Sequence, residues 1–388
     1  MTEEFPDADW LSRADLKALI AALGPGNARY VGGAVRDTLL NIAVKDIDLA
    51  TPLLPHDVIT RLETAGIRCV PTGIDHGTVT AVLERGPVEI TTLRRDVSTD
   101  GRRATVAFST EWQDDAARRD FTINALYVDP ETRQLFDFFG GRSDLAKKRL
   151  RFIGDARQRI REDHLRILRY FRFQARFGSQ PADAEAESAC RDLAPTLKGL
   201  SRERIGMEMM NLLSLPDPAP TIAWMEELGV LDVILSEAVA PSLAELTNQE
   251  CRQGIAPDAL RRLAALLPAD RVLASRVASR FRLSNAQKKR LVSAASRTAE
   301  ADEPRALAYR LGREQALDRL LIAGSDIASI IDWEIPQLPL KGGEIVDRGV
   351  LAGPEVARIL QTVEARWIDE GFPDRDRVSA LLDEELAR

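Results

Sequence analysis

Cysteine and histidine are scarce in this chain of 388 residues, which contains three of each. The cysteines are odd in number and widely spaced, which argues against a disulfide framework and against a cysteine-based zinc site. No two histidines stand at the spacing of paired metal ligands. A metal ion would therefore have to be held by carboxylates, the ligands that Mg²⁺ and similar hard cations prefer. The six residues concerned are Cys69, Cys190, Cys251, His56, His76 and His164.

Long apolar runs are absent as well. No stretch of about 18 apolar residues occurs, so we expect no membrane-spanning helix and no membrane partner. The first ten residues (MTEEFPDADW) are acidic and polar and lack the basic start and apolar stretch of a secretory signal, which predicts a cytoplasmic protein. Hydrophobic residues still make up 45% of the chain. That share and the length predict about two to four domains with ordinary cores.

The net charge of −7 taken alone disfavours a nucleic-acid partner. The charge is unevenly distributed, however, because the segment Arg85 to Arg172 contains 19 Lys and Arg against 14 Asp and Glu. A basic run is ordinarily a solvated helix face. This one coincides with most of the motifs described below, so its local charge matters more than the total.

Strand-like and helix-like segments alternate in the first part of the chain, and strand signals vanish from about Asp155 onward. Beyond that point 160–177 and 202–213 have helical periodicity. The pattern predicts an α+β head of about 150 residues, with about five strands in a mixed sheet, followed by an all-helical body and tail. The expected strands are 28–32, 46–50, 78–83, 88–93 and 123–129, and 34–40 is expected to begin a helix.

A glycine pair joins the first strand to the first helix in the motif Gly32–Asp37 (GGAVRD). Two glycines at such a junction let backbone amides approach a phosphate closely, and a helix N-terminus favours the same anion. Arg36, in the first turn, can reach that anion too. The alternative is an ordinary tight turn.

Acidic residues alternate with an apolar one at Asp46, Ile47 and Asp48. Residues i and i+2 of a strand point to the same face, so the two carboxylates project side by side and repel each other unless a cation neutralises them. Paired metal ions held by such carboxylates catalyse phosphoryl transfer. Glu89, on a later strand, is a candidate third ligand. The alternative for all three is a solvent-facing position.

Six motifs in one order give the chain a family resemblance. They are GGAVRD, DIDLAT, VEITTLRRD, DGRR, RRDFTINAL and REDHLRILRYFRF, all between Gly32 and Phe173. In order and spacing they resemble the tRNA nucleotidyltransferase (CCA-adding) and bacterial poly(A) polymerase family. A weaker similarity continues through 201–213 and 341–354. The resemblance implies a polymerase-β-like nucleotidyltransferase head, Mg²⁺ as cofactor, tRNA, CTP and ATP as partners, and no haem or organic cofactor.

The resemblance also implies roles for the residues of the head. Asp46 and Asp48 match the catalytic metal ligands, with Glu89 as a possible addition. The nucleotide's phosphates would be held by Gly32, Gly33, Arg36 and the adjoining Asp37.

Two later motifs of the head match a mobile loop and a ribose-binding segment. The loop that switches the enzyme to the final nucleotide matches Asp100, Arg102 and Arg103. The ribose-reading motif matches Arg119, Asp120 and Asn124. Carboxylate and amide groups can hydrogen-bond a 2′-hydroxyl, which fits selection of ribonucleotides.

The segment Glu162–Arg166 (EDHLR) resembles the nucleobase-reading motif of the family. On a continuous helix Asp163 and Arg166 would lie on one face, and Arg169 would extend it. A carboxylate and a guanidinium together offer the acceptors and donors that imitate a Watson–Crick edge. The alternative is an ordinary salt bridge on a helix surface.

These motifs together imply template-independent addition of CCA to the 3′ end of tRNA, with release of pyrophosphate. Poly(A) synthesis is the first alternative. Residues 67–77 lack the basic, aromatic-rich segment expected there for a poly(A) polymerase, and the intact DGRR segment favours full CCA addition. A catalytically silent RNA-binding protein is the second alternative, which the retention of Asp46 and Asp48 opposes.

The expected division of the chain has four parts. The catalytic head covers 1–152 and a helical neck that recognises the base covers 153–215. A helical body covers 216–300, and a helical tail that binds tRNA covers 301–388.

Overall fold

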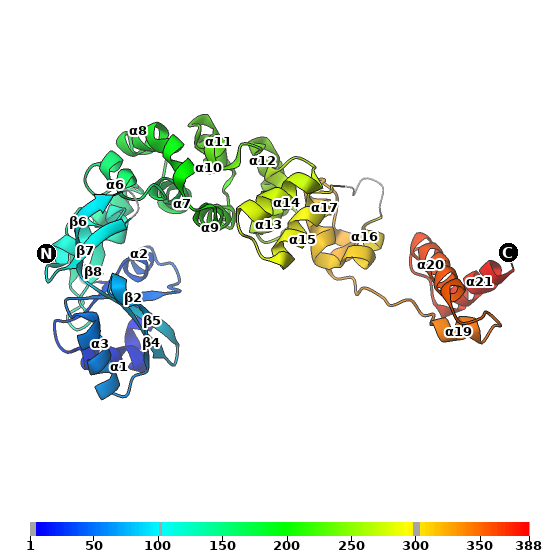
Figure 1. Cartoon of the computed structure of the whole chain (residues 1–388), viewed down its shortest axis with the longest axis horizontal. Helices are drawn as coiled ribbons and strands as arrows, with labels where there is room; N and C mark the ends of the chain where they lie inside the picture. Colours follow the sequence, from blue (N-terminus) through cyan, green and yellow to red (C-terminus); the bar gives the residue numbers. More distant parts are fainter. Residues whose placement is uncertain (1–4, 101–102, 298–302, 388) are drawn as a thin grey trace. The chain divides into compact units, whose positions relative to one another are not determined.

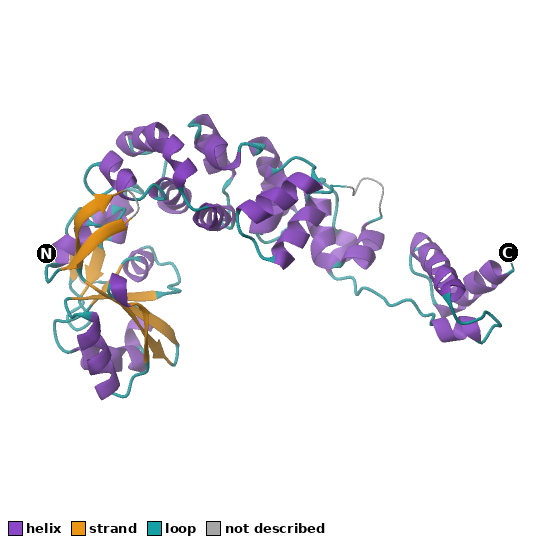
Figure 2. Ribbon diagram, in the orientation of Figure 1, coloured by secondary structure: helices purple, strands orange, loops and turns teal. Residues whose placement is uncertain are grey.

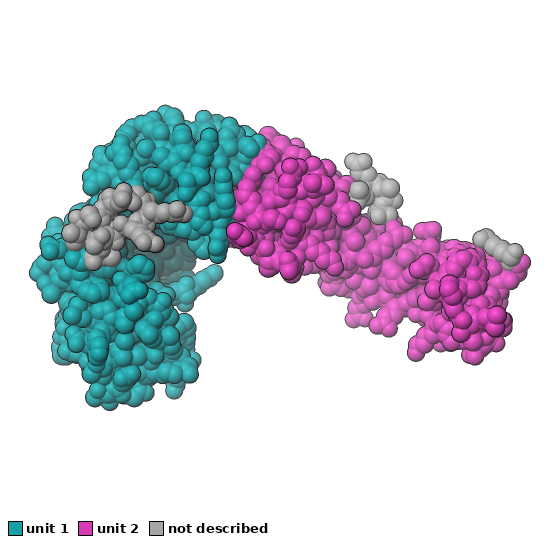
Figure 3. Space-filling view, viewed as in Figure 1, with its two compact units in different colours: residues 1–208, 224–236 teal, residues 209–223, 237–388 magenta. Residues whose placement is uncertain are grey.

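A computed structural model describes residues 5–100, 103–297 and 303–387, with 96–100 and 103–106 described by their backbone alone. The chain forms two compact units (Figure 3). Unit 1 contains 1–208 and 224–236, and unit 2 contains 209–223 and 237–388. Among the described residues no helix is both long and apolar enough to cross a bilayer.

Unit 1 is built around a seven-stranded mixed sheet with the order β3-β4-β5-β2-β1-β8-β9 (Figures 1 and 2). The α+β head expected from the sequence is confirmed, but the sheet is larger than the expected five strands. β3 and β9 were missed because they are short and mostly solvent-accessible, so they lack a clear apolar alternation. The strands are β1 (Arg29–Val31), β2 (Ile47–Thr51), β3 (Cys69–Gly73), β4 (Thr78–Leu83), β5 (Gly86–Thr92), β8 (Leu126–Val128) and β9 (Leu135–Asp137).

The register of this sheet brings the glycine turn to the acidic strand. β1 pairs antiparallel with β2, and Val31, the last residue of β1, lies opposite Asp48. Gly32 follows at once and opens α2 (Gly33–Leu39). On its other side β2 runs parallel to β5, with Asp48 opposite Glu89. The sheet therefore places the glycine turn next to Asp48 on its central strand β2, with Glu89 on the neighbouring strand.

A separate two-stranded sheet follows β5 and consists of β6 (Arg94–Asp100) and β7 (Arg103–Phe108). The expected mobile-loop segment lies at its tip, where Asp100 pairs in register with Arg103. The side chains of these two residues and the whole of Arg102 lie outside the described part of the chain. Their predicted role in nucleotide switching stays a prediction.

The segment expected as a strand over 123–129 is only partly one. Thr122–Asn124 form a 3-10 helix, η3, and the strand β8 begins at Leu126. The tight turn has a local cause, because the Asp120 carboxylate accepts hydrogen bonds from the backbone of Phe121 and from the Asn124 side chain. Asn124 is thereby turned toward α2 instead of alternating along a strand.

The helix expected over 160–177 is interrupted. α6 (Ala156–Glu162) ends before Asp163, whose backbone is extended at φ −149°, and α7 (Arg166–Phe177) begins three residues later. The Asp163 side chain accepts a hydrogen bond from the backbone of Leu165, and the Asp163 carbonyl accepts one from the backbone of Arg166. An Asp that bonds its own backbone two residues on favours a turn over a continuing helix.

Aromatic packing fixes α7 against the sheet domain. Phe121 and Phe152 pair across an isolated β-bridge, with ring centroids 4.9 Å apart. Tyr170 and Phe173 of α7 pack on them, with centroids 5.6 Å from Phe152 and 5.3 Å from Phe121, respectively. Unit 1 therefore holds the polar face of α7 beside the segment 118–124. Its remaining helices are η1 (Asp9–Ser12), α1 (Ala14–Leu23), α3 (Pro55–Thr64), η2 (Ile74–His76), α4 (Trp112–Ala117), α5 (Gly141–Ala146), α8 (Ala184–Leu193), η4 (Ala194–Gly199) and α11 (Val230–Leu235).

Unit 2 is helical throughout its described residues and has two apolar clusters. One gathers around Leu320 and Leu321, and the other around the buried Trp367. α9 (Arg202–Leu213) and α10 (Ala219–Glu227) cross the division between the units. The other helices are α12 (Ala240–Arg252), α13 (Ala259–Leu266), α14 (Arg271–Arg280), α15 (Asn285–Ala294), α16 (Pro304–Leu311), α17 (Arg313–Ile322), α18 (Ala328–Ile331), α19 (Gly342–Val346), α20 (Pro354–Asp369) and α21 (Arg375–Leu386).

Candidate active site

One open cavity of about 600 Å³ in unit 1 collects most of the residues that the sequence motifs single out. Its size is that of a ligand pocket, and its walls are dominated by charged side chains. It is lined by Gly32, Gly33, Arg36, Asp46, Asp48, Arg118, Arg119, Asp120, Asn124, Asp163, Arg166, Arg169 and Phe173.

The glycine turn forms one wall of this cavity. Gly32 has a φ of +70°, a conformation that L side chains rarely adopt, and a Cβ at this position would lie 3.4 Å from Nη1 of Arg119. The turn therefore favours glycine at this position, and the Arg119 side chain packs directly on it.

Arg36, in the first turn of α2, is held on several sides. Its Nη1 donates to Oδ1 of Asn124 at 2.6 Å, and its Nε donates to Oδ1 of Asp37 at 2.8 Å. The guanidinium also lies 4.2 Å above the ring of Phe177. Asp37 itself does not line the cavity: it is buried behind Arg36 and also contacts Arg176 at 3.4 Å. Asp37 thus supports Arg36 from behind.

Two carboxylates, Asp46 and Asp48, face the cavity at the start of β2. Burial and the nearby charges of Glu89 and Asp46 raise the pKa of Asp48 to about 6, although Arg119 opposes the shift. A cation bound beside this carboxylate would stabilise its charged form and lower its pKa. Glu89 is exposed and does not line the cavity. Within the described residues no three acidic, His or Cys side chains form a metal-binding group. The pair nevertheless fits a Mg²⁺ ion of the kind that takes one or two carboxylates and completes its shell with substrate phosphates and water.

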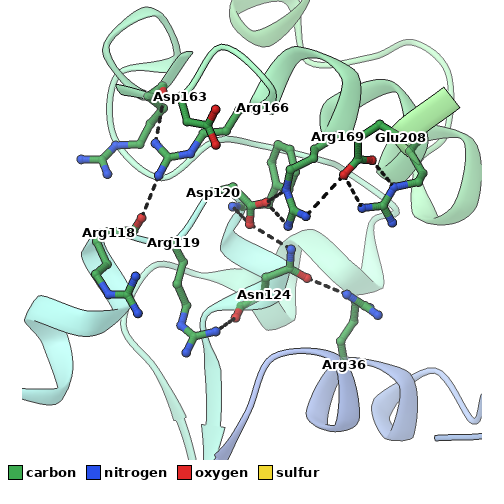
Figure 4. A network of polar contacts seen from close by, with 12 residues as sticks. Arg36, Arg118, Arg119, Asp120, Asn124, Asp163, Arg166, Arg169 and Glu208 are labelled. Carbon is green, nitrogen blue, oxygen red and sulfur yellow. Dashed lines mark hydrogen bonds and ion pairs between the residues drawn. The ribbon is translucent and has the colours of Figure 1, made fainter. Parts of the chain in front are cut away.

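Polar contacts continue from Arg36 across the cavity floor to α7 (Figure 4). Asn124 accepts from Arg36 and donates through Nδ2 to Oδ1 of Asp120 at 3.0 Å. The other oxygen of Asp120 accepts from Nε of Arg169 at 2.7 Å. Burial alone would raise the pKa of Asp120, but Arg169 and Asn124 outweigh it and lower that pKa. Asp120 is therefore a charged link between the 3-10 turn and α7.

Arg169 also contacts a residue to which the sequence motifs assign no role. Glu208, buried on α9, lies 3.9 Å from Nη1 of Arg169 and accepts from Nε of Arg172 at 2.6 Å. Glu208 thus neutralises part of the positive charge of Arg169 and Arg172 on α7. Glu208 falls in the segment 201–213 of weaker similarity, but no role could be predicted for it from the sequence, because its partners lie on a helix more than thirty residues away.

Asp163 and Arg166 both line the cavity, but they do not share a helix face as the sequence predicted. Asp163 lies in the break between α6 and α7 and pairs with Arg204 of α9 at 2.7 Å. Arg166 pairs with Glu162 at 2.6 Å, and its Nη2 donates to the carbonyl of Arg118 at 3.1 Å. A surface salt bridge between Asp163 and Arg166, the alternative considered for this pair, is absent from these contacts.

Two cavity residues were not assigned from the sequence. Phe173 presents an apolar ring beside the arginines of α7, with Arg172 4.7 Å above it. Arg118 precedes the residues matched to the ribose-reading motif, and no role of its own was predicted from the sequence. Its side chain is mostly buried, paired with Asp115 at 2.7 Å. The helical position of Arg118 after Asp115, at i+3, was the available signal.

Known proteins are similar to this chain over most of its length. The family described as poly A polymerase head domain matches residues 28–151, and the family described as probable RNA and SrmB-binding site of polymerase A matches 183–243. The chain is 34% identical to the mouse mitochondrial CCA tRNA nucleotidyltransferase 1 over 400 residues, covering 96% of this chain and 90% of the relative. A CCA-adding enzyme of Streptococcus gordonii is 31% identical over 92% of this chain and 93% of its own. The chain belongs to the CCA tRNA nucleotidyltransferase family.

A solved member of the CCA-adding family has the same fold. The crystal structure of the Bacillus stearothermophilus CCA-adding enzyme in complex with CTP aligns with a TM-score of 0.72 and 26% identity, covering 96% of this chain and 98% of that one. The fold expected from the motifs is therefore confirmed. In the present chain most of the motif residues converge on one cavity. Asp37 and Glu89 do not line it, and the side chains of the loop residues Asp100, Arg102 and Arg103 are not described.

Proposed function

We propose that this chain adds the nucleotides C, C and A to the 3′ end of tRNA, using CTP and ATP, without a nucleic-acid template. The observation that carries the proposal is the cavity in unit 1, where a carboxylate pair, a glycine turn and a set of arginines meet. The curated relatives that match nearly the whole chain are CCA-adding enzymes, which supports CCA addition over poly(A) synthesis.

The reaction is an in-line attack of the RNA 3′-hydroxyl on the α-phosphate of the nucleotide. The bond from the α-phosphate to the bridging oxygen breaks, and pyrophosphate leaves. Asp46 and Asp48 would hold Mg²⁺, which when bound lowers the pKa of the hydroxyl and neutralises phosphate charge. Arg36, Arg118 and Arg119 place positive charge along the same cavity, where the triphosphate has to lie.

We assign base recognition to the opposite side of the cavity. Arg166 is held at its Nη1 by Glu162 and at its Nη2 by the Arg118 carbonyl, so its guanidinium has a fixed orientation. Asp163 offers a carboxylate from the break before α7. A fixed donor set and a nearby acceptor suit the edges of cytosine and adenine.

Incubation of the protein with tRNA transcripts that end before CCA tests this proposal. Labelled NTPs are supplied singly and in mixtures, always with Mg²⁺, and the product lengths are read on a gel. We expect two additions with CTP, a third only when ATP is also present, and none with UTP or GTP. Long products with ATP alone would establish poly(A) synthesis instead. Binding of tRNA without any addition would establish the silent RNA-binding alternative.

We further propose that unit 2 holds the body of the tRNA, and that α14 and α15 take part besides the tail. Residues 271–297 contain eight Lys and Arg and no Asp or Glu, in a chain whose net charge is −7. The side chains of three of these cations, Arg271, Arg282 and Lys289, make no ion pair or hydrogen bond with the described residues. Arg271 and Lys289 line a groove of about 530 Å³, together with Lys288 and Arg319.

The tail presents a different charge pattern. Arginines of its helix pair α20–α21 are neutralised by acidic residues: Arg358 pairs with Glu355 and Glu385, and Arg377 pairs with Glu370 and Glu384. Exposed ion pairs of this kind leave little net charge for an RNA phosphate. The unpaired cations of α14 and α15 are therefore the better candidates for backbone contacts.

A further inference from the structure

Asp115 is a buried carboxylate that lies outside the recognised sequence motifs and does not line the nucleotide cavity. It lies in α4, and only 1% of its surface is exposed. Its Oδ1 accepts from Nε of Arg118 at 2.7 Å, and its Oδ2 accepts from Nη2 of Arg119 at 3.1 Å. The hydroxyl of Tyr127, on β8, donates to Oδ2 at 2.8 Å. Both oxygens are thus occupied, by two arginines that follow α4 directly and by a tyrosine from β8.

Both arginines that Asp115 holds line the nucleotide cavity. Arg119 extends past Asp115 to the glycine turn, where its Nη1 lies 3.4 Å from the Asn124 carbonyl and equally far from the place of a Cβ on Gly32. Arg118 uses its backbone carbonyl to accept from Arg166 on the opposite wall. One carboxylate therefore orients the guanidinium groups of two residues in the cavity wall, and one of them reaches the glycine turn.

The charges of this cluster favour an anion in the cavity. One carboxylate neutralises one guanidinium, so the group of Asp115, Arg118 and Arg119 keeps one net positive charge, and that charge faces the cavity. Burial alone would raise the pKa of Asp115, but Arg119 and Arg118 outweigh it and lower that pKa to about 2. Asp115 stays ionised at neutral pH, and its two hydrogen-bond acceptors stay fixed.

Tyr127 completes the cluster from the core of the sheet. Its ring is fully buried, and its hydroxyl accepts from Nε of Arg119 at 3.1 Å while donating to Asp115. A rigid aromatic side chain in this position removes rotational freedom from both partners. The guanidinium of Arg119 is thereby set in place before any nucleotide binds, which reduces the entropy lost on binding.

We propose that Asp115 is a positioning residue of the nucleotide site, which holds Arg118 and Arg119 in the orientation that binds the triphosphate of the incoming nucleotide. The proposal rests on the function proposed above, since it assumes that CTP and ATP occupy the cavity. Asp115 acts through the two arginines and touches neither substrate nor reacting atoms.

Direct binding of CTP, measured by calorimetry, and steady-state kinetics test the proposal on the full chain. Asp115→Asn keeps the shape of the side chain but removes the charge that orients the guanidinium groups. We expect the Kd and the KM for CTP to rise on the order of tenfold, as for loss of one hydrogen bond to a charged group, with a smaller change in kcat. In an Arg119→Ala background the same substitution should add at most a few-fold, because its main route to the nucleotide is already gone.

Asp144 provides a matched control in the same unit. Its side chain is also fully buried and accepts from Arg149 at 2.8 Å, Arg151 at 3.1 Å and Thr122 at 2.7 Å, but neither arginine lines the cavity. Asp144→Asn should lower stability and leave the Kd for CTP unchanged.

Three outcomes decide the matter. A folded Asp115→Asn variant that binds CTP as the unaltered chain does would overturn the positioning role. If Asp115→Asn does not fold, Tyr127→Phe replaces it, since it removes only the hydroxyl. An unchanged CTP affinity in Tyr127→Phe would overturn the role as well. Failure of the unaltered chain to bind CTP would instead refute the proposed function.

Discussion

Asp120 and Arg169 form the ion pair that joins the 3-10 turn of the sheet domain to helix α7. Oδ2 of Asp120 lies 2.7 Å from Nε of Arg169 and 2.5 Å from its Nη2. With Oδ1 already bonded to Asn124 and to the backbone of Phe121, the carboxylate has all its strong acceptor positions in use. The residue that the motif assigned to ribose recognition thus has a structural task as well. The Asn124 amide accepts one hydrogen bond and donates one among the described residues, so it keeps donor and acceptor capacity and is the better candidate for contacting the sugar.

Ribose selection should therefore depend more on Asn124 than on Asp120. We expect the unaltered chain to prefer CTP strongly over dCTP, and Asn124→Ala to reduce the ratio of their kcat/KM values by about tenfold, as for loss of one hydrogen bond to the 2′-hydroxyl. The measurement is kcat/KM for both nucleotides on the same tRNA. Equal use of CTP and dCTP by the unaltered chain would show that neither residue reads the ribose.

Removal of the carboxylate pair should abolish incorporation. Asp46→Ala and Asp48→Ala each delete a cavity-facing carboxylate at the start of the central strand β2, where the fold needs neither side chain for its core. We expect circular dichroism and the unfolding midpoint to stay close to those of the unaltered chain, and incorporation to be undetectable. Chelation of divalent cations should have the same effect and be reversed by added Mg²⁺. Normal incorporation by a folded double variant would remove these residues from catalysis.

Base choice should be affected separately from chemistry. Arg166→Ala deletes a guanidinium that lines the cavity and is fixed by Glu162 and the Arg118 carbonyl. A site that hydrogen-bonds its substrate leaves buried polar groups unpaired when the wrong one enters. Each missing hydrogen bond to a charged group is worth about 1.5–3 kcal/mol, so discrimination of CTP and ATP from UTP and GTP should fall about tenfold to hundredfold. Comparison of kcat/KM for all four nucleotides measures it. Unchanged ratios in an active variant would leave Arg166 a purely structural role.

Much of this site could be predicted from the sequence because its motifs are local. The glycine turn, the alternating Asp46 and Asp48, and the segment containing Asp120 and Asn124 each span only a few residues, and the chain brings them together through strand pairing. The helical body and the mixed sheet domain followed in the same way from local periodicity.

What the sequence could not predict depends on contacts across the chain. The break at Asp163 arises from a side chain bonding its own backbone, which competes closely with helix continuation and is not decided by periodicity. Glu208 and Tyr127 acquire their roles only through partners on other elements. The strands β3 and β9 are too short and too exposed to carry an apolar pattern.

Asp115 should give the fold a measurable sensitivity to acid. Its pKa is lowered from a usual value of 3.8 to about 2 by Arg119 and Arg118 against the effect of burial. A carboxyl whose pKa is depressed in the folded state contributes stability that is complete above its unfolded pKa and is lost as the pH falls toward its folded pKa. The contribution is about 2 kcal/mol at neutral pH and falls by about 1 kcal/mol between about pH 5 and pH 3. Urea unfolding of the unaltered chain and of Asp115→Asn should therefore show a stability difference that narrows by that amount. A difference independent of pH would contradict the ion pairing.

The charge of α14 and α15 leads to the last prediction, which concerns tRNA affinity. Arg271 and Lys289 line the groove of unit 2 and have no ion-pair partner among the described residues. Each cation that binds an RNA phosphate releases a condensed counterion, so binding weakens with salt in proportion to the number of phosphates bound. Reversing both charges in Arg271→Glu/Lys289→Glu should weaken tRNA binding on the order of tenfold or more. It should also reduce the slope of log K against log salt by about 1 for each phosphate that is no longer bound.

Filter binding of tRNA across a series of salt concentrations gives both quantities. Lys17→Glu is the control, because it reverses the charge of an exposed lysine on α1 of unit 1, outside the nucleotide cavity. It should leave the slope of log K against log salt unchanged. CTP affinity should be unchanged in all these variants, because the groove and the cavity belong to different units and share no residue. If the double reversal kept the affinity and salt slope of the unaltered chain, the backbone contacts would have to lie elsewhere in unit 2, and the paired arginines of α20 and α21 would be the next surface to alter.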